Sequence, residues 1–198
     1  MALYPLRHRF HKSHWRGFTL IELVVVTGIM VLISSLILTS SSKFGGVVTL
    51  RNLAYDIALS IRQAQTYGIA VRRFSNSNFK AGYGVHFDLS NSTSFVLFAD
   101  AVSTNGLYDQ GELVQSETIG RGFNIVDLCA TTNLSDTEGC GLSSLDILFK
   151  RPEPDAQIRI NGGAQVNAKG RIVVSSPRGD RLSIVVEAPG QIAVASAP

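Results

Sequence analysis

The pattern of hydrophobic and polar residues changes twice along the chain, and each change marks a different kind of element. From Phe18 to Leu38 the residues are apolar on every side, and Glu22 is the single charge among 21 positions. At ~1.5 Å per residue a helix of this length is ~31 Å long, which is enough to cross the hydrocarbon core of a bilayer. The sequence therefore predicts a membrane-spanning helix over residues 18–38.

A second helical pattern follows, and it is amphipathic. Apolar residues recur at helical spacing on one face, while charged and amide side chains fall on the others. This apolar stripe consists of Leu50, Leu53, Ala54, Ile57, Ile61 and Ala64. We expect one long helix from Phe18 to about Val71, with its first half in lipid and its second half packed on a sheet. Gly45-Gly46 leaves two alternatives open, a kink or a continuous helix. Leu59 falls among polar residues, so it is either an ordinary exposed leucine or a contact with another subunit.

After Arg73 the hydrophobic period falls to two, which is typical of half-buried strands. A turn is expected at Asn91-Ser92-Thr93, and a terminal hairpin around Pro189-Gly190. The predicted strands are 83–89, 94–99, 112–119, 122–128, 145–149, 157–160, 171–175, 181–187 and 191–195. The fold class is α+β, with one long N-terminal helix packed on an antiparallel, β-rich C-terminal domain.

Charge is unevenly distributed, and this sets an orientation. Four basic residues and no acidic ones precede the apolar run: Arg7, Arg9, Lys12 and Arg16. Positive flanks stay in the cytoplasm, so the β-rich domain is expected on the other side of the membrane. Without these four, the chain's 18 basic residues become 14 against 15 acidic residues, a net charge of −1. A strongly basic nucleic-acid-binding domain does not have this composition.

The order of signals at the start of the apolar run is unusual. A secretory signal is cut after its apolar segment, whereas here the Gly17-Phe18 junction precedes it and Glu22 follows five residues after Gly17. This arrangement resembles the signal of type IV prepilins over roughly residues 12–40. The resemblance implies cleavage between Gly17 and Phe18 by an inner-membrane prepilin peptidase, followed by N-methylation of Phe18.

The same resemblance implies an organisation and a location. Residues 1–17 would be a cleaved leader, 18–38 the transmembrane and assembly helix, 39–73 its amphipathic continuation, and 74–198 an extracytoplasmic, β-rich globular domain. The protein would be stored in the bacterial inner membrane as a single-pass protein and then enter a pilus or pseudopilus. Its partners would be the peptidase, other pilins or pseudopilins in a helical filament, and an inner-membrane assembly platform.

Glu22 is the one residue of the apolar run whose ionised side chain is unfavourable in a membrane. A carboxylate in a membrane span costs about 2.5 kcal/mol or more unless it finds a partner. One interpretation is a carboxyl group that is protonated or reaches the membrane edge. The other is that the α-amine of Phe18 in a neighbouring, staggered subunit neutralises Glu22, so that the pair sets the register of a filament.

The long helix and the β-rich half also resemble the type IV pilin fold as a whole. Within that superfamily, Ile61-Arg62-Gln63-Ala64 leading into Ile69-Ala70-Val71 is similar to the end of the helix in minor pseudopilins. The H-type subunits of type II secretion and the FimT-type minor pilins are the nearest match. The resemblance therefore implies a structural subunit of a type II secretion pseudopilus or of a type IV pilus. A membrane-anchored domain that never polymerises is an alternative.

The two cysteines, Cys129 and Cys140, both follow the predicted span. Outside the cytoplasm disulfides persist, and a bridge enclosing about a dozen residues stabilises by roughly 3 kcal/mol. The alternative is two unrelated buried thiols. Two cysteines with no histidine nearby are too few for a zinc site. We predict a disulfide between them.

No constellation of residues indicates an enzyme or a cofactor. Gly-x-Ser-x-Gly and phosphate-binding motifs are absent from the sequence, and His86 is expected to be a solvated side chain on a strand. Asp100, Asp109 and Glu112 are weak calcium candidates, because some pseudopilins bind calcium. Their spacing does not match the EF-hand register, and a plain Asn-Gly turn between strands is the alternative interpretation.

A DNA-uptake pilin is the remaining functional alternative. The last fifty residues contain a local excess of basic side chains, and some FimT-type minor pilins bind DNA through a Gly-Arg-x-Arg element. The comparable segment here, Gly190-Gln191-Ile192-Ala193, lacks both arginines, and Gly170-Arg171-Ile172-Val173 keeps only the first. Phosphate binding scales with the number of cations presented together, so this departure argues against nucleic acid as a partner.

Overall fold

A computed structural model describes residues 17–70, 72–74, 81–131, 137–166 and 168–197. The chain divides into two compact units, Met1–Lys43 and Phe44–Pro198. One helix, α1 (Leu20–Ile69), contributes to both units and is assigned without interruption through Gly45 and Gly46. The alternative of a continuous helix is therefore the one observed. The helix begins two residues after the predicted start, and Val71 lies outside the described residues.

The second half of α1 buries the predicted apolar stripe. Five of its six residues are at most 2 % exposed: Leu50, Ala54, Ile57, Ile61 and Ala64. The sixth, Leu53, is half-buried at the border of the core. Burying a large aliphatic side chain contributes about 1.5–3 kcal/mol relative to leaving it in water. Packing of this stripe, rather than helix propensity, therefore stabilises this half of α1.

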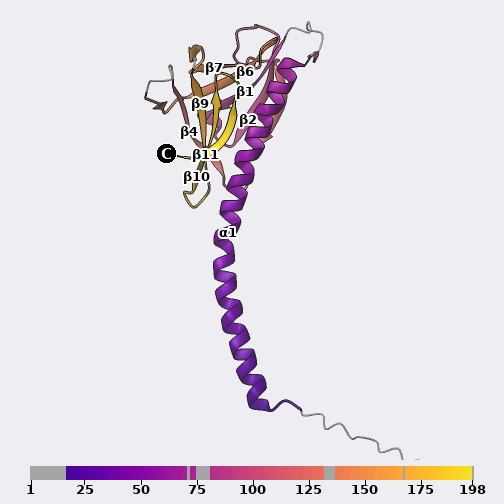
Figure 1. Ribbon diagram of the computed structural model, residues 1–198, viewed down its shortest axis with the longest axis vertical. Coiled ribbons are helices and arrows are strands. Elements are labelled where there is room, and N and C mark those ends of the chain that lie inside the picture. Colours follow the sequence, from indigo (N-terminus) through magenta and orange to yellow (C-terminus); the bar gives the residue numbers. More distant parts are fainter. Residues whose placement is uncertain (1–16, 71, 75–80, 132–136, 167, 198) are drawn as a thin grey trace, which may run out of the picture. The chain divides into compact units, whose positions relative to one another are not determined.

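The rest of the globular unit consists of two sheets in which every neighbouring pair of strands is antiparallel (Figure 1). The six-stranded sheet has the order β3-β2-β1-β6-β7-β8, and the five-stranded sheet has the order β11-β10-β9-β4-β5. The first sheet is built from β1 (Gly82–Asp88), β2 (Ser94–Asp100), β3 (Leu113–Thr118), β6 (Ser144–Phe149), β7 (Ala156–Ile160) and β8 (Ala164–Val166). The second is built from β4 (Asn124–Thr131), β5 (Gly139–Cys140), β9 (Lys169–Ser175), β10 (Arg181–Glu187) and β11 (Ile192–Ser196).

Alternation along the strands decides which side chains join the helix in the core. In β1, Tyr83, Val85 and Phe87 are buried, and the last two belong to the same hydrophobic cluster as the helix stripe. The intervening positions point to the opposite face of the sheet, as period-two geometry requires. The helix stripe and the inner faces of both sheets thus form one core.

The end of α1 fits closely against β6, and this fit requires a glycine. A Cβ atom added at Gly68 would lie 2.4 Å from the carbonyl oxygen of Phe149, which is too close for two non-bonded atoms. One turn earlier, the side-chain amide of Gln65 donates to the carbonyl oxygens of Gly190, at 3.0 Å, and Pro154, at 3.2 Å. These contacts fix the helix to the loop before β7 and to the turn before β11.

All nine predicted strands are present: β10 has the predicted bounds, and the ends of the others differ by at most three residues. The terminal hairpin of β10 and β11 is confirmed. Two short strands, β5 and β8, were not predicted. The sequence predicted the end of a strand at Leu89 and a turn at residues 91–93. A short 3-10 helix, η1 (Leu89–Asn91), begins there instead, because the Asp88 carboxylate accepts the amide hydrogen of Ser90.

Candidate processing and assembly site

The junction between Gly17 and Phe18 is exposed. Phe18 has 81 % of its surface exposed, and a Cβ atom added at Gly17 would meet no other atom within 4 Å. Both residues precede α1 and lie outside regular secondary structure. An accessible, non-helical peptide bond is what a protease requires. Residues 1–16 of the predicted leader lie outside the described residues.

Thr19 caps the first turn of α1. Its hydroxyl oxygen accepts the backbone N–H of Glu22 at 3.3 Å, and its carbonyl oxygen accepts the N–H of Leu23 at 3.1 Å. A threonine followed three residues later by glutamate is the capping-box sequence. Thr19-Leu20-Ile21-Glu22 displays this signal in the sequence, and it places the start of the helix directly after Thr19. Glu22 therefore also has a local role, because an acidic group in the first turn interacts favourably with the helix dipole.

The apolar half of α1 is exposed along its length in the part of the chain that the structure describes. Leu20–Leu38 is long and apolar enough to cross a membrane, and none of its side chains is buried. The hydroxyl of Thr27, the polar side chain in its middle, donates to the carbonyl oxygens of Leu23 and Val24 at 2.9 and 3.0 Å. A hydroxyl that bonds to its own helix does not need water.

The sequence around Glu22 contains few possible partners for its carboxylate. Arg16 lies six residues before it, and the next basic residue after it is Lys43. Along a helix, 21 residues correspond to ~31 Å, so Lys43 is far from Glu22. Removal of the leader would take Arg16 away and create an α-amine on Phe18. That amine, in the same or another copy, is then the nearest cation that the chain can supply.

The predicted disulfide between Cys129 and Cys140 is present. The two residues are direct cross-strand partners in β4 and β5, with their Cα atoms 4.0 Å apart. Cys129 is buried and Cys140 is exposed. Next to them, the Asp127 carboxylate accepts the amide hydrogen of Gly141 at 2.8 Å. The bridge and this hydrogen bond together hold β5 and the residue after it against β4.

Among the described residues, one group of three side chains of metal-ligating type comes together: Asp127, Cys129 and Cys140. Both sulfur atoms are used in the disulfide, and a thiolate is what binds a metal. This group therefore does not fit a metal ion in the oxidised protein.

Of the calcium candidates, Asp100 is the last residue of β2, whereas Asp109 and Glu112 lie on the loop between β2 and β3, and the oxygen atoms of all three are engaged by the chain itself. Glu112 is fully buried, and its Oε1 accepts the amide hydrogens of Ala101, Val102 and Ser103 while its Oε2 accepts that of Asp109. N–H groups that point at a carboxylate occupy the directions from which a cation would bind. Glu112 is thus the anchor of the loop, which is more than the plain Asn-Gly turn that the sequence suggested.

The two other candidate carboxylates, Asp109 on the loop and Asp100 at the end of β2, are engaged in the same way. The Asp109 carboxylate accepts from the side-chain amide of Asn105 at 2.9 Å and from the Ser103 hydroxyl. The Asp100 carboxylate, 2 % exposed, accepts the amide hydrogen of Gly106 at 3.2 Å. Burial raises the pKa of Asp100 above its usual range. The three carboxylates therefore do not fit a calcium site as they stand.

His86 is not the solvated side chain that the sequence predicted. It is half-buried, and its Nδ1 lies 2.7 Å from a carboxylate oxygen of Asp146, which is itself 1 % exposed. The same oxygen accepts the backbone N–H of Tyr108 at 3.2 Å, and the Tyr108 ring lies 5.3 Å from the His86 ring. The loop after β2 therefore folds over the outer face of the first sheet and covers this pair. Strand alternation could not reveal such a cover.

Part of the basic excess near the end of the chain is neutralised. Arg171 donates to the Glu138 carboxylate at 2.8 Å and to the Ser183 hydroxyl at 3.1 Å. Lys169 lies 3.8 Å from the same carboxylate. Cations that are paired within the protein contribute less to phosphate binding than free ones.

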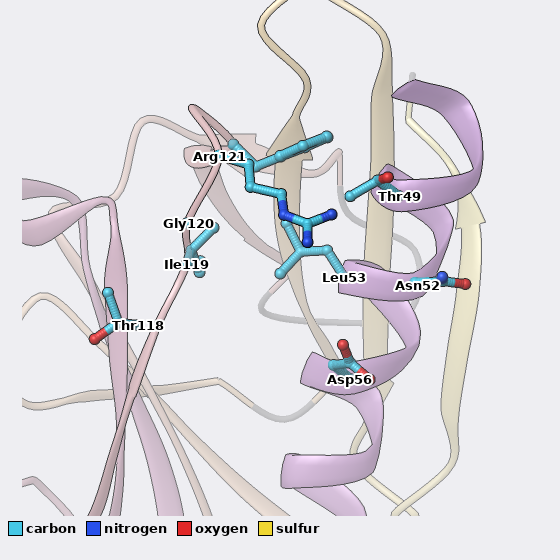
Figure 2. A pocket seen from close by; sticks show the side chains of 9 residues that line it. Thr49, Asn52, Leu53, Asp56, Thr118, Ile119, Gly120 and Arg121 are labelled. Atoms are coloured by element: carbon cyan, nitrogen blue, oxygen red, sulfur yellow. The ribbon is translucent and has the colours of Figure 1, made fainter. Parts of the chain in front are cut away.

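A groove lies beside α1 in the globular unit (Figure 2). One wall is the helix, and the other is the end of β3 with the loop after it. The lining residues on the helix are Thr49, Asn52, Leu53 and Asp56, and those on the other wall are Thr118, Ile119, Gly120, Arg121 and Phe123. In Figure 2 the Arg121 side chain extends from its loop toward the helix. The sequence analysis did not predict this groove, because its walls are distant in the chain.

Comparison of the chain with protein-family models, with curated proteins and with solved structures found no match.

Proposed function

We propose that this chain is a structural subunit, a minor pilin or pseudopilin, of a type IV pilus or a type II secretion pseudopilus. It would be cut between Gly17 and Phe18, held in the inner membrane by Leu20–Leu38, and lifted into a filament. The observation that carries the proposal is the arrangement Gly17-Phe18-Thr19-Leu20-Ile21-Glu22 directly at the start of an exposed apolar helix. A secretory signal has its cleavage site on the opposite side of the apolar segment.

The isolation of Glu22 supports an assembly role for that residue. After cleavage the nearest cation in the sequence is the new terminus of Phe18, and in a filament each subunit can offer this terminus to a neighbour. An unpaired carboxylate in lipid is strongly unfavourable, and a neighbouring cation offsets much of that cost. Register between helices would then follow from charge pairing, and cohesion would follow from the apolar surface of Leu20–Leu38.

The globular unit supports a location outside the cytoplasm. It contains a disulfide, and disulfides persist in oxidising compartments. The basic residues before the span orient the chain in the same sense. No residue cluster in the described chain supports a catalytic role better than a structural one, so we propose no enzymatic activity.

The first experiment tests processing. The full chain is expressed with and without a prepilin peptidase, and the N-terminus of the membrane-bound product is determined by mass spectrometry. We expect a product that begins at Phe18 and carries an N-methyl group. Gly17→Ala should leave the precursor uncut. Gly28→Ala is the matched control, because a Cβ atom added at Gly28 would also meet no other atom within 4 Å.

Retention of residues 1–17 in the presence of the peptidase would contradict the proposal. It would favour a membrane-anchored domain that does not polymerise.

The second experiment tests assembly. Glu22→Ala should be processed normally and should be absent from sheared filaments, because its helix lacks the partner for the neighbouring amine. Glu22→Asp keeps the charge and should restore part of the incorporation. Thr27→Ala is the control, since the Thr27 hydroxyl bonds only within its own helix. Normal incorporation of Glu22→Ala would show that charge pairing does not set the register.

A further inference from the structure

The two sheets have four edges, and two of them are long and open. The edge strands β5 and β8 have two and three residues, so their outer edges offer little backbone to a further strand. The other two, β3 and β11, have six and five. Among the described residues, the backbone of β3 is hydrogen-bonded on the β2 side alone, and that of β11 on the β10 side alone. Each therefore presents a row of N–H and C=O groups without partners.

Both open edges lie beside α1, on different sides of the same helical segment. On one side, β3 and α1 enclose a groove lined by Leu53, Asp56, Leu59, Ser60, Phe95, Glu117, Thr118 and Ile119, which shares four of these residues with the groove of Figure 2. On the other side, where Figure 1 shows β11 in yellow near the helix, a groove is lined by Tyr55, Ala58, Leu59, Arg62, Ile192 and Val194. Leu59, 65 % exposed, forms the ridge between the two grooves.

The two edges carry opposite charge. On the β3 side, Asp56 is exposed and Glu117 is half-exposed, and Glu117 receives a hydrogen bond from Gln115 but has no cation beside it in the described chain. On the β11 side, the charged residue is Arg62, which is exposed. Arg121 lines the groove of Figure 2 and is not among the residues that line the groove beside Glu117. A surface with two carboxylates and a surface with one guanidinium are complementary.

We propose that β11 of one copy of this chain adds to the open edge of β3 in the next copy, so that their sheets become continuous. Strand addition of this kind gains affinity from backbone hydrogen bonds and specificity from alternate side chains. Ile192 and Val194, half-buried on the helix side of β11, would enter the groove beside Leu53 and Leu59 of the next copy. Arg62 of the first copy would then meet Asp56 and Glu117 of the second.

The chemistry of the edges favours this pairing over the symmetric ones. A contact of β3 with β3 would bring Asp56 and Glu117 of both copies together, and like charges oppose such a contact. A contact between two different edges leaves one edge of each kind free at the ends of the assembly. Repetition of such a contact produces an open helical polymer. The inference rests on the proposed function and names the surface through which the globular units would meet in the filament.

Cross-linking of the full chain in assembled filaments tests the contact. Ser116→Cys lies on the outer face of β3 and Ala193→Cys on the outer face of β11, and both positions are exposed. A short bismaleimide is suitable because it reaches direct and diagonal neighbours, about 5 to 8 Å apart between strands. The native cysteines do not react with it, because they are joined in the disulfide.

The expected result is a ladder of covalent multimers from the double variant in filaments. Each single variant should stay monomeric, and a mixture of the two single variants should give dimers and nothing larger. Filaments of the double variant that remain monomeric after cross-linking would overturn the inference and leave the proposed function intact. Dimers from Ser116→Cys alone would overturn it as well, because they would show β3 pairing with itself.

Charge reversal provides a second measurement. Arg62→Glu should lower the yield of the ladder about fivefold, which corresponds to the loss of an exposed ion pair of about 1 kcal/mol. Adding Glu117→Arg to that variant should restore the yield. Failure of restoration would count against the pairing of these residues.

Loss of the proposed function itself has a different signature. In the double-cysteine background, Glu22→Ala should abolish both filaments and ladder. A ladder that persists without filaments would support the edge contact and would show that it forms without the register that Glu22 is proposed to set. The remaining outcome is that the variant that keeps Glu22 retains its leader and forms no filaments. That outcome would contradict the proposed function and this interface together.

Discussion

The two halves of α1 differ in how their apolar surface is covered. In Leu20–Leu38 the apolar side chains surround the helix and are exposed throughout, and this half is long and apolar enough to cross a membrane. In the second half the apolar residues are confined to one stripe, from Leu50 to Ala64, and the protein itself covers them. One helix therefore combines a segment that is apolar on all sides with a segment that is apolar on one side only. The periodicity of the apolar residues, rather than their number, distinguishes the two halves.

Two exposed residues of the second half break this simple division. Tyr55 and Leu59 are 53 and 65 % exposed, although they belong to the half that the domain covers. They lie on the opposite side of the helix from Ile57 and Ile61, as a period of 3.6 residues requires. The proposed interface between copies would bury this part of the helix surface.

The largest expected effect comes from matched truncations in the two halves. Ile57→Ala should lower the free energy of unfolding of the globular unit by about 2–5 kcal/mol, because it leaves a cavity in the core. Ile33→Ala removes the same atoms from an exposed position and should leave that free energy unchanged within about 0.5 kcal/mol. Denaturant titration of the purified full chain in detergent micelles, followed by circular dichroism, measures both. Equal effects of the two substitutions would show that the halves of α1 do not differ as described.

The next effect compares the helix stripe with the covalent link in the second sheet. Replacing Cys129 and Cys140 by alanine should lower the free energy of unfolding by about 3 kcal/mol in the chain-entropy model. Removal of the bridge frees the segment between the cysteines in the unfolded chain and leaves the helix stripe untouched. A reducing agent should therefore destabilise the parent protein to the same extent and have no effect on the double alanine variant. Unchanged stability of that variant would mean that the core alone determines the fold.

Periodicity was sufficient to predict most of the fold. The period-3.6 stripe placed the second half of α1, and period-two alternation placed nine of the strands. It failed at β5 and β8, because two or three residues are too few to show a period. The predicted disulfide then explains why β5 exists, since it holds Cys140 directly opposite Cys129.

The buried polar groups could not be predicted in this way. Glu112 and Asp146 are acidic and would be expected at the surface, yet each is buried and accepts hydrogen bonds from the loop after β2. Which backbone amides converge on a carboxylate depends on how a loop folds over a sheet. At the candidate site the situation is reversed, because the Gly17-Phe18 junction and Glu22 are evident in the sequence, while their function depends on other molecules.

A smaller effect concerns the beginning of the apolar half of α1. Thr19→Ala removes the hydroxyl that accepts the amide hydrogen of Glu22, and the loss of an N-cap costs about 1 kcal/mol of helix stability. We expect faster hydrogen exchange at the amides of residues 20–23 in micelles, with no change in the globular unit. Thr19→Ser keeps the hydroxyl and should behave as the parent. Equal exchange in the alanine variant would show that the cap is dispensable in an apolar solvent.

The smallest expected effect compares a buried carboxylate of the globular unit, Asp100, with an exposed one, Asp155. Burial raises the pKa of Asp100, so its neutral form is favoured in the folded state. The stability that this preference provides is complete below the ordinary carboxylate pKa and is lost as the pH rises through the raised pKa. Asp100→Asn keeps an oxygen to accept the Gly106 amide hydrogen and cannot ionise. It should therefore match the parent at low pH and unfold at a higher temperature than the parent at neutral pH.

Asp155→Asn, at an exposed position, should show no such difference. Thermal unfolding measured across this pH range decides the matter, and a neutral-pH melting temperature lower than that of the parent would show that Asp100 is needed in its charged form.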